Sequence, residues 1–330
     1  MHVLFSAPAY KPAWRYGGPV VAVSRLAESL AAKGVRVTVF TSDSNLDQDL
    51  DIPIGRPVNV DGVEVWYFRR KDSFQKKLTL LPYLSRSVGF LYTPSMSPEL
   101  DRLVPSVDIV HTQAPFVYGT FAAARVAARF GKPLVYHQHG AYNPQSLRFR
   151  RVKKSLYIAA IEKPIMRRAA VLVALTEFEA SSFRRFQLPT PIRVIPIAVD
   201  TAELQPVKRS PSSQHIVTLG TLHYPPNADG IRWFVDEVFP KITSRVPDAS
   251  VTIIGKNPPA DFLAFPDRYA GRIRVTGYVP ELLPYLQEAA IMVVPVRAGG
   301  GMRVRILEAF AGGMPVVTTT VGLEGIDAVP

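Results

Sequence analysis

The 330-residue sequence contains no cysteine, which excludes disulfide bonds, thiolate metal ligands and cysteine nucleophiles. It has no apolar run of about 18 residues, the length that a membrane-spanning helix needs, and no basic segment at its start. These absences are typical of a cytoplasmic protein without a targeting peptide. Hydrophobic residues nevertheless make up 47% of the chain, which is enough for the cores of two ordinary domains.

Acidic residues are scarce in the first part of the chain, so the net charge of +12 is unevenly distributed. Residues 1–200 carry the whole excess, whereas residues 201–330 hold 12 basic and 12 acidic residues. The densest basic stretch has one acid, Glu162, and eight bases: Arg148, Arg150, Arg151, Lys153, Lys154, Lys163, Arg167 and Arg168. Such a stretch favours an anionic partner.

Two interpretations of this basic stretch remain open. Apolar residues such as Ile158, Ile161 and Ile165 alternate with the bases at helical spacing, which favours a helix lying on an acidic membrane surface. A solvated helical face is the alternative. The sequence has no recognisable nucleic-acid-binding module, so nucleic acid is the least favoured partner.

Short β-branched runs alternate with amphipathic stretches, which is the pattern of parallel sheets with crossover helices. A helix is predicted at residues 17–33, with Gly34 at its end. The alternation breaks between residues 194 and 213, where proline and serine are frequent, and then restarts. The predicted strands are 2–6, 35–41, 63–68, 109–112, 133–137 and 171–175 before the break, and 215–219, 250–254, 273–276, 290–294 and 315–318 after it.

This pattern predicts an α/β protein with two doubly wound, Rossmann-like domains and a cleft between them. We expect a first domain at residues 1–195, a linker at 196–213 and a second domain at 214–330. The second domain would have five strands but would lack the helices that normally close such a sheet. We therefore expect it to be incomplete at its C-terminus, because an apolar sheet face would be left uncovered.

An anion-binding loop is predicted between residues 294 and 308. An apolar strand leads into three glycines (residues 299–301), which allow backbone N–H groups to approach a ligand closely. Arg303 and Arg305 add positive charge at the start of the following helix, whose N-terminus also favours anions. Glu308, about two turns into that helix, would accept hydrogen bonds from sugar hydroxyls. Phosphate and ribose together indicate a nucleotide.

Four segments, in this order, resemble those of one known family. They are Tyr16-Gly17-Gly18-Pro19, the strand end His137-Gln138-His139-Gly140, the segment Val194-Ile195-Pro196-Ile197-Ala198-Val199-Asp200, and the glycine loop continued through Glu308-Ala309-Phe310-Ala311-Gly312-Gly313-Met314-Pro315-Val316-Val317. The family is that of the retaining, GT-B type glycosyltransferases of the group 1, or family 4-like, class. The segments span nearly the whole chain, and the fourth is highly specific.

The resemblance implies transfer of a sugar from a nucleotide-diphosphate sugar to a glycan or lipid-linked acceptor in polysaccharide biosynthesis. Transfer would retain the anomeric configuration and would use no cofactor and no metal ion. The first domain would bind the acceptor and the second the nucleotide. His139, Arg303 and Glu308 would be catalytic, and the donor would contact Gly17, Gly18, Gly220, Tyr278, Val279, Gly299, Gly300, Gly301, Arg303, Arg305 and Glu308.

Residues of the first domain would then face the acceptor. His111 and Gln113 end another strand at the same sheet edge as His139 and are predicted to line the acceptor pocket. The glycines at 17 and 18 would face the glycine loop across the cleft. The bases that would contact a lipid-linked acceptor or the inner face of the membrane are Arg148, Arg150, Arg151, Lys153 and Lys154.

The sequence departs from the family pattern in two places. Gly300 stands where many relatives have a glutamate that holds the donor sugar, as in a subset that reads Gly-Gly-Gly-x-Arg. The segment after Gly220 lacks the arginine and lysine that many relatives place on the diphosphate. Arg303 is the expected replacement cation, with Arg305 second. Ile197 and Ala198 replace an asparagine and a glycine of the family pattern.

Three other functions are alternatives to this one. A nucleotide-sugar epimerase or phosphorylase of the same fold would share these motifs, and a truncated, non-catalytic nucleotide-sugar-binding protein would explain the departures. A dinucleotide-dependent oxidoreductase is disfavoured, because no Gly-x-Gly-x-x-Gly follows the first predicted strand.

Overall fold

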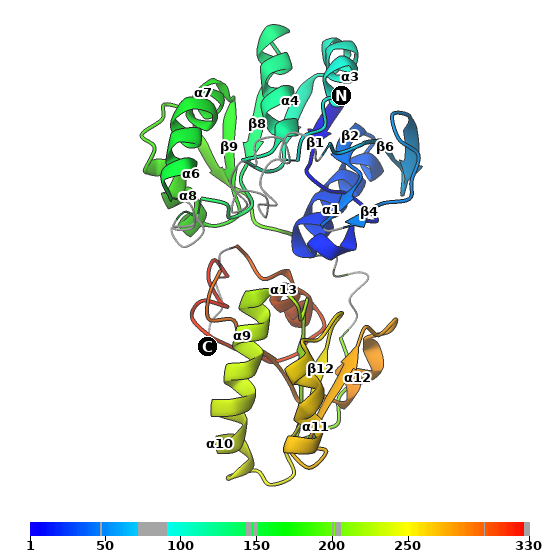
Figure 1. Ribbon diagram of the computed structural model, residues 1–330, viewed down its shortest axis with the longest axis vertical. Coiled ribbons are helices and arrows are strands. Elements are labelled where there is room, and N and C mark those ends of the chain that lie inside the picture. The colour runs from blue at the N-terminus through cyan, green and yellow to red at the C-terminus, as the bar shows by residue number, and fades with distance from the viewer. Residues whose placement is uncertain are drawn as a thin grey trace, which may run out of the picture. The chain divides into compact units, whose positions relative to one another are not determined.

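The computed structural model describes residues 1–46, 48–71, 91–142, 147, 151–199, 201, 206–299 and 301–326. The chain divides into two compact units, Met1–Pro196 and Ile197–Pro330, and each is described by itself (Figure 1). Within the described residues, no helix is both long and apolar enough to cross a lipid bilayer.

The first unit is built on a sheet of eight strands within its described residues, in the order β10-β9-β8-β7-β1-β2-β6-β5. All neighbouring strands are parallel except β5 and β6. The strands are β1 (His2–Ser6), β2 (Arg36–Ser42), β5 (Pro57–Val60), β6 (Val63–Phe68), β7 (Ile109–Thr112), β8 (Leu134–His137), β9 (Val171–Ala174) and β10 (Ile192–Val194). A short antiparallel ribbon is formed by β3 (Ser44–Asn45) and β4 (Gln48–Asp49).

The six strands predicted for this unit are present, with ends that differ by one residue at most. Two edge strands were not predicted. In β5 the side chains are only half-buried or exposed, so the apolar alternation is weak. Its turn into β6 is Asp61-Gly62, with φ of 50° and 82°, and an Asp-Gly pair between two strands is a recognisable hairpin signal. The other, β10, is short and largely exposed.

Helices cover both faces of this sheet. One face packs against α3, α4, α7 and α8, and the opposite face packs against α1. Figure 1 shows α3 and α4 side by side. The helices are α1 (Gly18–Ala32), α3 (Met96–Leu103), α4 (Tyr118–Arg129), α6 (Arg151–Tyr157), α7 (Lys163–Arg168) and α8 (Glu177–Arg184), and a π-helical turn (Ile158–Glu162) joins α6 to α7.

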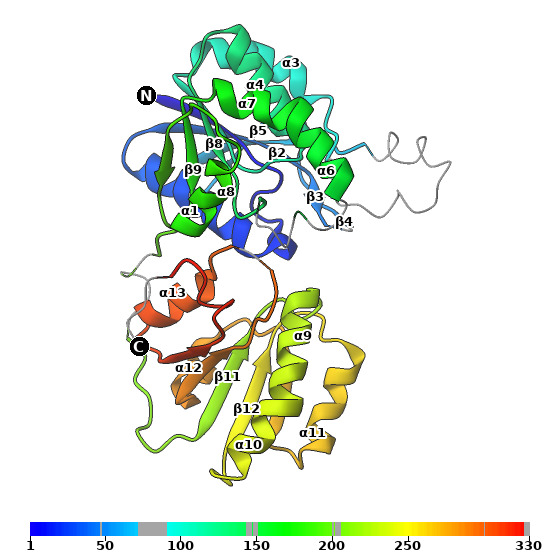
Figure 2. The same ribbon diagram turned by 90° about the vertical axis from the view of Figure 1, so that its left-hand side faces the viewer.

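The second unit has a parallel sheet of five strands in its described part, in the order β13-β12-β11-β14-β15. The strands are β11 (His215–Leu219), β12 (Ser250–Ile254), β13 (Ile273–Gly277), β14 (Ile291–Val294) and β15 (Val316–Thr318), close to the predicted ranges. One face packs against α9 (Pro225–Trp233), α10 (Phe239–Thr243) and α11 (Phe265–Arg268), and the other against α12 (Leu283–Glu288) and α13 (Val304–Ala311) (Figure 2).

The strand order fixes where a ligand site can form in each unit. The order reverses between β1 and β7 in the first sheet and between β11 and β14 in the second. Ligands of doubly wound folds bind outside the carboxyl ends of the strands at such reversals. The predicted doubly wound architecture is confirmed in both units, and a ligand site is expected in the loops after these strands.

Gly230 allows α9 to pack directly against the backbone that follows β14. A Cβ at this position would collide with the carbonyl oxygen of Pro295. We predict that Gly230→Ala lowers the free energy of unfolding by about 2 kcal/mol or more, although alanine normally stabilises a helix relative to glycine by roughly 0.5–1 kcal/mol. Urea unfolding would measure this. Asp229→Ala, an exposed neighbour on the same helix, should stay within about 0.5 kcal/mol of the unmodified protein.

Candidate functional site

The glycine loop of the second unit lies between β14 and α13. Gly299 and Gly301 have φ of 96° and 92°, a region that side chains disfavour, so the backbone itself calls for glycine at both places. Gly300, which the sequence analysis assigned to the donor site with these two glycines, lies outside the described residues.

The side chain of Arg303 forms hydrogen bonds with two backbone carbonyls of this loop. Its Nη1 donates to the carbonyl oxygen of Gly301 and its Nη2 to that of Gly299, each at 3.0 Å. Because the peptide group is planar and trans, the N–H of Met302 points away from the carbonyl that Arg303 binds. Burial lowers the pKa of the Arg303 guanidinium. The sequence predicted a phosphate contact for this cation, and the structure shows that it also fixes the loop.

Arg305 connects three elements of the second unit. Its Nη1 donates to the carbonyl oxygen of Leu219 at the end of β11, and its Nη2 donates to Oδ1 of Asn227 in α9 at 2.8 Å. Gly220 lies against the same guanidinium, which leaves no space for a Cβ at that position. Burial lowers the pKa of Arg305 to about 10. The side chain therefore has a packing role in the structure in addition to its predicted contact with the donor.

Glu308 lies on α13, half-buried, four residues after the first residue of the helix. The sequence placed it about two turns into the helix. The helix begins at Val304, because Arg303 has an extended backbone, so Glu308 is little more than one turn from the glycine loop. This correction brings its carboxylate closer to the loop than expected.

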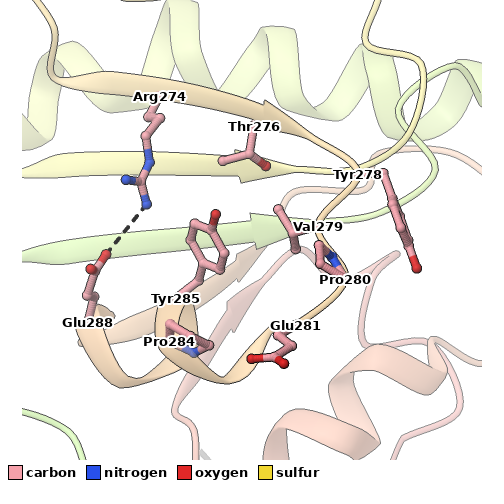
Figure 3. Close-up of a pocket in the computed structure, with 9 residues that line it drawn as sticks. All are labelled: Arg274, Thr276, Tyr278, Val279, Pro280, Glu281, Pro284, Tyr285 and Glu288. Carbon is pink, nitrogen blue, oxygen red and sulfur yellow. Dashed lines mark ion pairs between the residues drawn. The ribbon is translucent and has the colours of Figure 1, made fainter.

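Tyr278 and Val279 follow β13 and line an open pocket of about 570 Å³ (Figure 3). Tyr278 is 64% exposed as a residue, and Nζ of Lys256 lies 4.3 Å from the centroid of its ring, a cation–π arrangement. At the other end of the pocket, Arg274 pairs with Glu288 at 3.6 Å and covers the ring of Tyr285. The lining thus combines aromatic surface with paired charges.

In the first unit, the two predicted glycines lie at the start of α1. Gly17 has φ of 68° and ψ of −133°, a conformation that favours glycine, and it caps the start of α1 without a side-chain hydrogen bond. Gly18 is the first residue of the helix and is exposed. The N-terminal turn of α1 therefore presents backbone at the carboxyl end of β1.

Three histidine rings form a column at the carboxyl ends of β7 and β8. His137 stacks on His139 at 3.9 Å between ring centroids, and on His111 at 6.0 Å. Burial lowers the pKa of His111 to about 3 and that of His139 to about 4, and it lowers the pKa of His137 well below its ordinary value. The column is therefore uncharged near neutral pH. Within the described residues, no group of three or more metal-ligating side chains could hold a metal ion.

Gln113 joins this column. Its Oε1 lies 2.8 Å from Nε2 of His139, so the structure brings together two residues that the sequence assigned to different substrates. Neither ring nitrogen of His137 has a hydrogen-bond partner in the described part of the chain. It lies on the opposite face of the strand from Gln138, as the alternation predicts.

Glu162 was missed as a site residue. Its side chain is only 1% exposed and accepts hydrogen bonds from the backbone N–H of Phe116 at 2.7 Å and from the hydroxyl of Tyr136 at 2.5 Å. The sequence does contain a signal, because Glu162 lies four residues from the buried Ile158 and four from the buried Met166. A lone acid on the apolar face of a basic helix indicates a buried partner.

The basic stretch is only partly described, because Arg148 and Arg150 lie outside the described residues. On α6, Arg151 and Lys153 are exposed, whereas Lys154 turns inward and lies 5.7 Å from the ring centroid of Phe116. Two apolar side chains between the bases are also exposed, Val152 at 73% and Leu156 at 67%. This surface is therefore both basic and apolar.

Comparison with known proteins identifies families for both units. Residues 17–198 match the family described as "Glycosyl transferase 4-like domain", and residues 213–329 match "Glycosyl transferases group 1". Over 117 residues the chain is 28% identical to an uncharacterized 44.6 kDa protein in the cps region of Klebsiella pneumoniae. That match covers 34% of this chain and spans 30% of the length of the relative.

Solved structures share the fold of the whole chain. HepE from Anabaena in complex with UDP has a TM-score of 0.67 and 16% identity, with 98% of this chain and 81% of that chain covered. Sucrose-phosphate synthase from Thermosynechococcus elongatus has a TM-score of 0.68 and 18% identity, with 100% of this chain and 84% of that chain covered. These similarities confirm the predicted GT-B fold.

The histidine column predicts how stability depends on pH. Because the three folded-state pKa values lie below the unfolded value of 6.5, the unfolded chain binds more protons as pH falls below 6.5. Stability should therefore fall between pH 6.5 and about 4, by up to about 1.4 kcal/mol per pH unit for each histidine. Urea unfolding at several pH values would measure this slope.

His137→Phe keeps the aromatic stack and removes one titrating group. Between pH 6.5 and about 4, we expect the slope of its unfolding free energy against pH to be smaller by the contribution of about one proton. Its free energy of unfolding at pH 7 should not fall. A slope equal to that of the unmodified protein would show that His137 does not contribute to the effect.

Proposed function

Because the chain belongs to the family of glycosyl transferase 4-like domains, we propose that it transfers a sugar from a nucleotide-diphosphate sugar to a glycan or lipid-linked acceptor. The observation that carries this proposal is the glycine loop that Arg303 braces at the start of α13. It lies at the carboxyl end of β14, next to the strand reversal of the second sheet.

The second unit would bind the nucleotide. The first backbone N–H groups of a helix have no partner within the helix, which suits a diphosphate. We assign the diphosphate to Gly299, Gly300, Gly301 and Arg303, with Gly220 and Arg305 next to them. The carboxylate of Glu308 would accept hydrogen bonds from the ribose hydroxyls. The backbone at Tyr278 and Val279 would contact the base. HepE has been solved with UDP and with UDP-glucose, which makes a uridine nucleotide the first donor to test.

The first unit would contribute to sugar transfer and acceptor binding. His139 would contact the donor sugar, while Gly17 and Gly18 would approach the diphosphate. The ring of His111 packs edge-on against Phe5 at 4.9 Å between centroids, so we assign it to the wall of the acceptor pocket rather than to direct contact. Gln113 would face the same pocket.

The proposed chemistry explains why a strong base is not required. The bond between the anomeric carbon and the diphosphate oxygen breaks while a bond to the acceptor oxygen forms. Negative charge then grows on the leaving diphosphate, and preorganised N–H donors and cations stabilise that charge. The family resemblance supports retention of the anomeric configuration and a reaction without a metal ion.

Binding of a nucleoside diphosphate tests the donor site directly. We predict that UDP, or another member of a panel of nucleoside diphosphates, raises the melting temperature of the protein in a concentration-dependent manner. Glu308→Ala should weaken the affinity by roughly 10- to 100-fold, because hydrogen bonds to a charged group contribute about 1.5–3 kcal/mol. The matched control is Glu237→Ala, at an exposed glutamate of the second unit outside the proposed donor site. No stabilisation by any nucleotide would contradict the proposal.

The basic and apolar surface of α6 suits a lipid-linked acceptor at a membrane. We propose that this surface binds anionic lipid at the cytoplasmic face, where each base near the surface contributes about 1 kcal/mol. The exposed Val152 and Leu156 support a lipid surface over a solvated face, because they would enter the interface between lipid headgroups and chains.

Vesicle sedimentation tests this surface. We predict that vesicles containing phosphatidylserine bind the protein and that changing Arg150, Arg151, Lys153 and Lys154 together to glutamate abolishes binding. The control makes the same change in net charge at four exposed bases of the second unit, Lys208, Lys241, Arg245 and Arg272. Equal loss of binding in both variants would indicate a net-charge effect, and unchanged binding in the first would exclude α6 as the membrane surface.

A further inference from the structure

Two loops of the first unit contain strained backbone close to the candidate sugar contact. Phe116, in the loop after β7, has φ of 62°, and His139, in the loop after β8, has φ of 48°. Residues other than glycine avoid this region at a cost of roughly 1–2 kcal/mol. Such conformations persist only where surrounding contacts hold them, and they gather at functional sites.

The carboxylate of Glu162 holds the first loop. Its Oε1 accepts the backbone N–H of Phe116 at 2.7 Å, and the side chain is almost fully buried. Phe116 lies three residues after Gln113, whose own backbone N–H donates to the carbonyl oxygen of Ser6 at 2.9 Å, so the hydrogen bond from Glu162 holds the loop that leads away from Gln113. A hydrogen bond to a buried carboxylate is stronger than one between neutral groups.

The same carboxylate is connected to the second loop through two tyrosines. Oε2 of Glu162 accepts from the hydroxyl of Tyr136 at 2.5 Å, and the hydroxyls of Tyr136 and Tyr142 lie 2.6 Å apart. Tyr136 lies three residues before His139, and Tyr142 lies three residues after it. Burial raises the pKa of both phenols well above its ordinary value, so they remain protonated donors.

The two loops meet at the hydrogen bond between Gln113 and His139. With Oε1 of Gln113 as the acceptor at 2.8 Å, Nε2 of His139 carries the proton and Nδ1 keeps its lone pair. His137 stacks on the ring of His139, and His111 lies on the other side of His137. Desolvation lowers the pKa of both neighbours, so they are neutral near pH 7.

A π-helical turn at the end of which Glu162 lies directs its side chain toward these loops. The turn spans Ile158–Glu162, between α6 and α7, and Pro164 follows it with no N–H to donate to the preceding turn. Ile158 and Met166 are buried on the same side as Glu162, which places the carboxylate within the apolar face of the helix. Turns of this kind occur frequently at functional sites.

From these contacts we infer that Glu162 is a positioning residue that sets the orientation and the tautomer of His139. By holding the loops after β7 and β8 together, it makes Gln113 the acceptor for Nε2–H of His139. Nδ1 of His139 is then available to accept a hydrogen bond from a hydroxyl of the donor sugar. The use of Nδ1 rests on the proposed function, whereas the positioning does not.

Nitrogen NMR of histidine-labelled full-length protein reports the tautomer and the pKa of His139 without any substrate. In the unmodified protein we expect the Nε2–H tautomer and a pKa near the low value of about 4. In Glu162→Leu, a mixture of tautomers and a pKa that moves toward 6.5 are expected, because the loops are released and the ring gains solvent. Glu162→Gln keeps an acceptor for the N–H of Phe116, so an intermediate shift is expected.

Two milder variants keep the inference testable if Glu162→Leu does not fold. Tyr142→Phe removes one hydroxyl from the network, and Gln113→Ala removes the acceptor itself, so both should change the tautomer ratio of His139. The matched controls are Glu177→Gln, at an exposed glutamate of α8, and Tyr285→Phe, in the second unit. Neither control should move the His139 signals.

The inference is overturned if folded Glu162→Leu or Tyr142→Phe leaves the tautomer and pKa of His139 unchanged, or if the unmodified protein shows the Nδ1–H tautomer. UDP titration separates this result from the proposed function, because UDP should stabilise the unmodified protein and Glu162→Gln equally. Failure of UDP to bind would count against the donor site alone, and the NMR result would still decide the role of Glu162.

Discussion

The buried carboxylate of Glu162 is the constraint on which the candidate site of the first unit depends. Removing a charge from water is costly unless hydrogen bonds replace its hydration, and this carboxylate obtains them from the backbone after β7 and from a tyrosine of β8. The same contacts hold two loops in backbone conformations that they would not adopt alone. Stability and site geometry are therefore determined by one set of hydrogen bonds, and a substitution at Glu162 affects both.

In the second unit, positively charged side chains hold the backbone at the end of the sheet. Arg303 and Arg305 donate to backbone carbonyls at the carboxyl ends of the strands and in the loop after β14. Glycines at these places leave space for the guanidinium groups and for close helix packing, as at Gly220 and Gly230. Each unit thus shapes the end of its sheet with a partly or fully buried ionic side chain rather than with regular secondary structure.

Much of the fold could be predicted because central parallel strands are buried on both faces and read as apolar, β-branched runs. The edge strands β5 and β10 were missed because half of their side chains meet solvent, although the Asp-Gly turn was available as a signal. The resemblance of four motifs to group 1 glycosyltransferases correctly indicated the GT-B fold. The contacts of individual side chains were less predictable: nothing local shows that Arg305 reaches the carbonyl oxygen of Leu219 at the end of β11, or that Glu162 meets the backbone of Phe116.

The histidine column has a consequence for the proton balance of the proposed reaction. An acceptor hydroxyl must lose its proton as it bonds to the anomeric carbon, and a base removes a proton well only when its pKa is near the working pH. Desolvation lowers the pKa values of His111, His137 and His139 far below neutrality, so these rings are poor acceptors for that proton. In the proposed reaction the proton therefore leaves with the departing diphosphate or passes to water. The three histidine rings stay uncharged throughout.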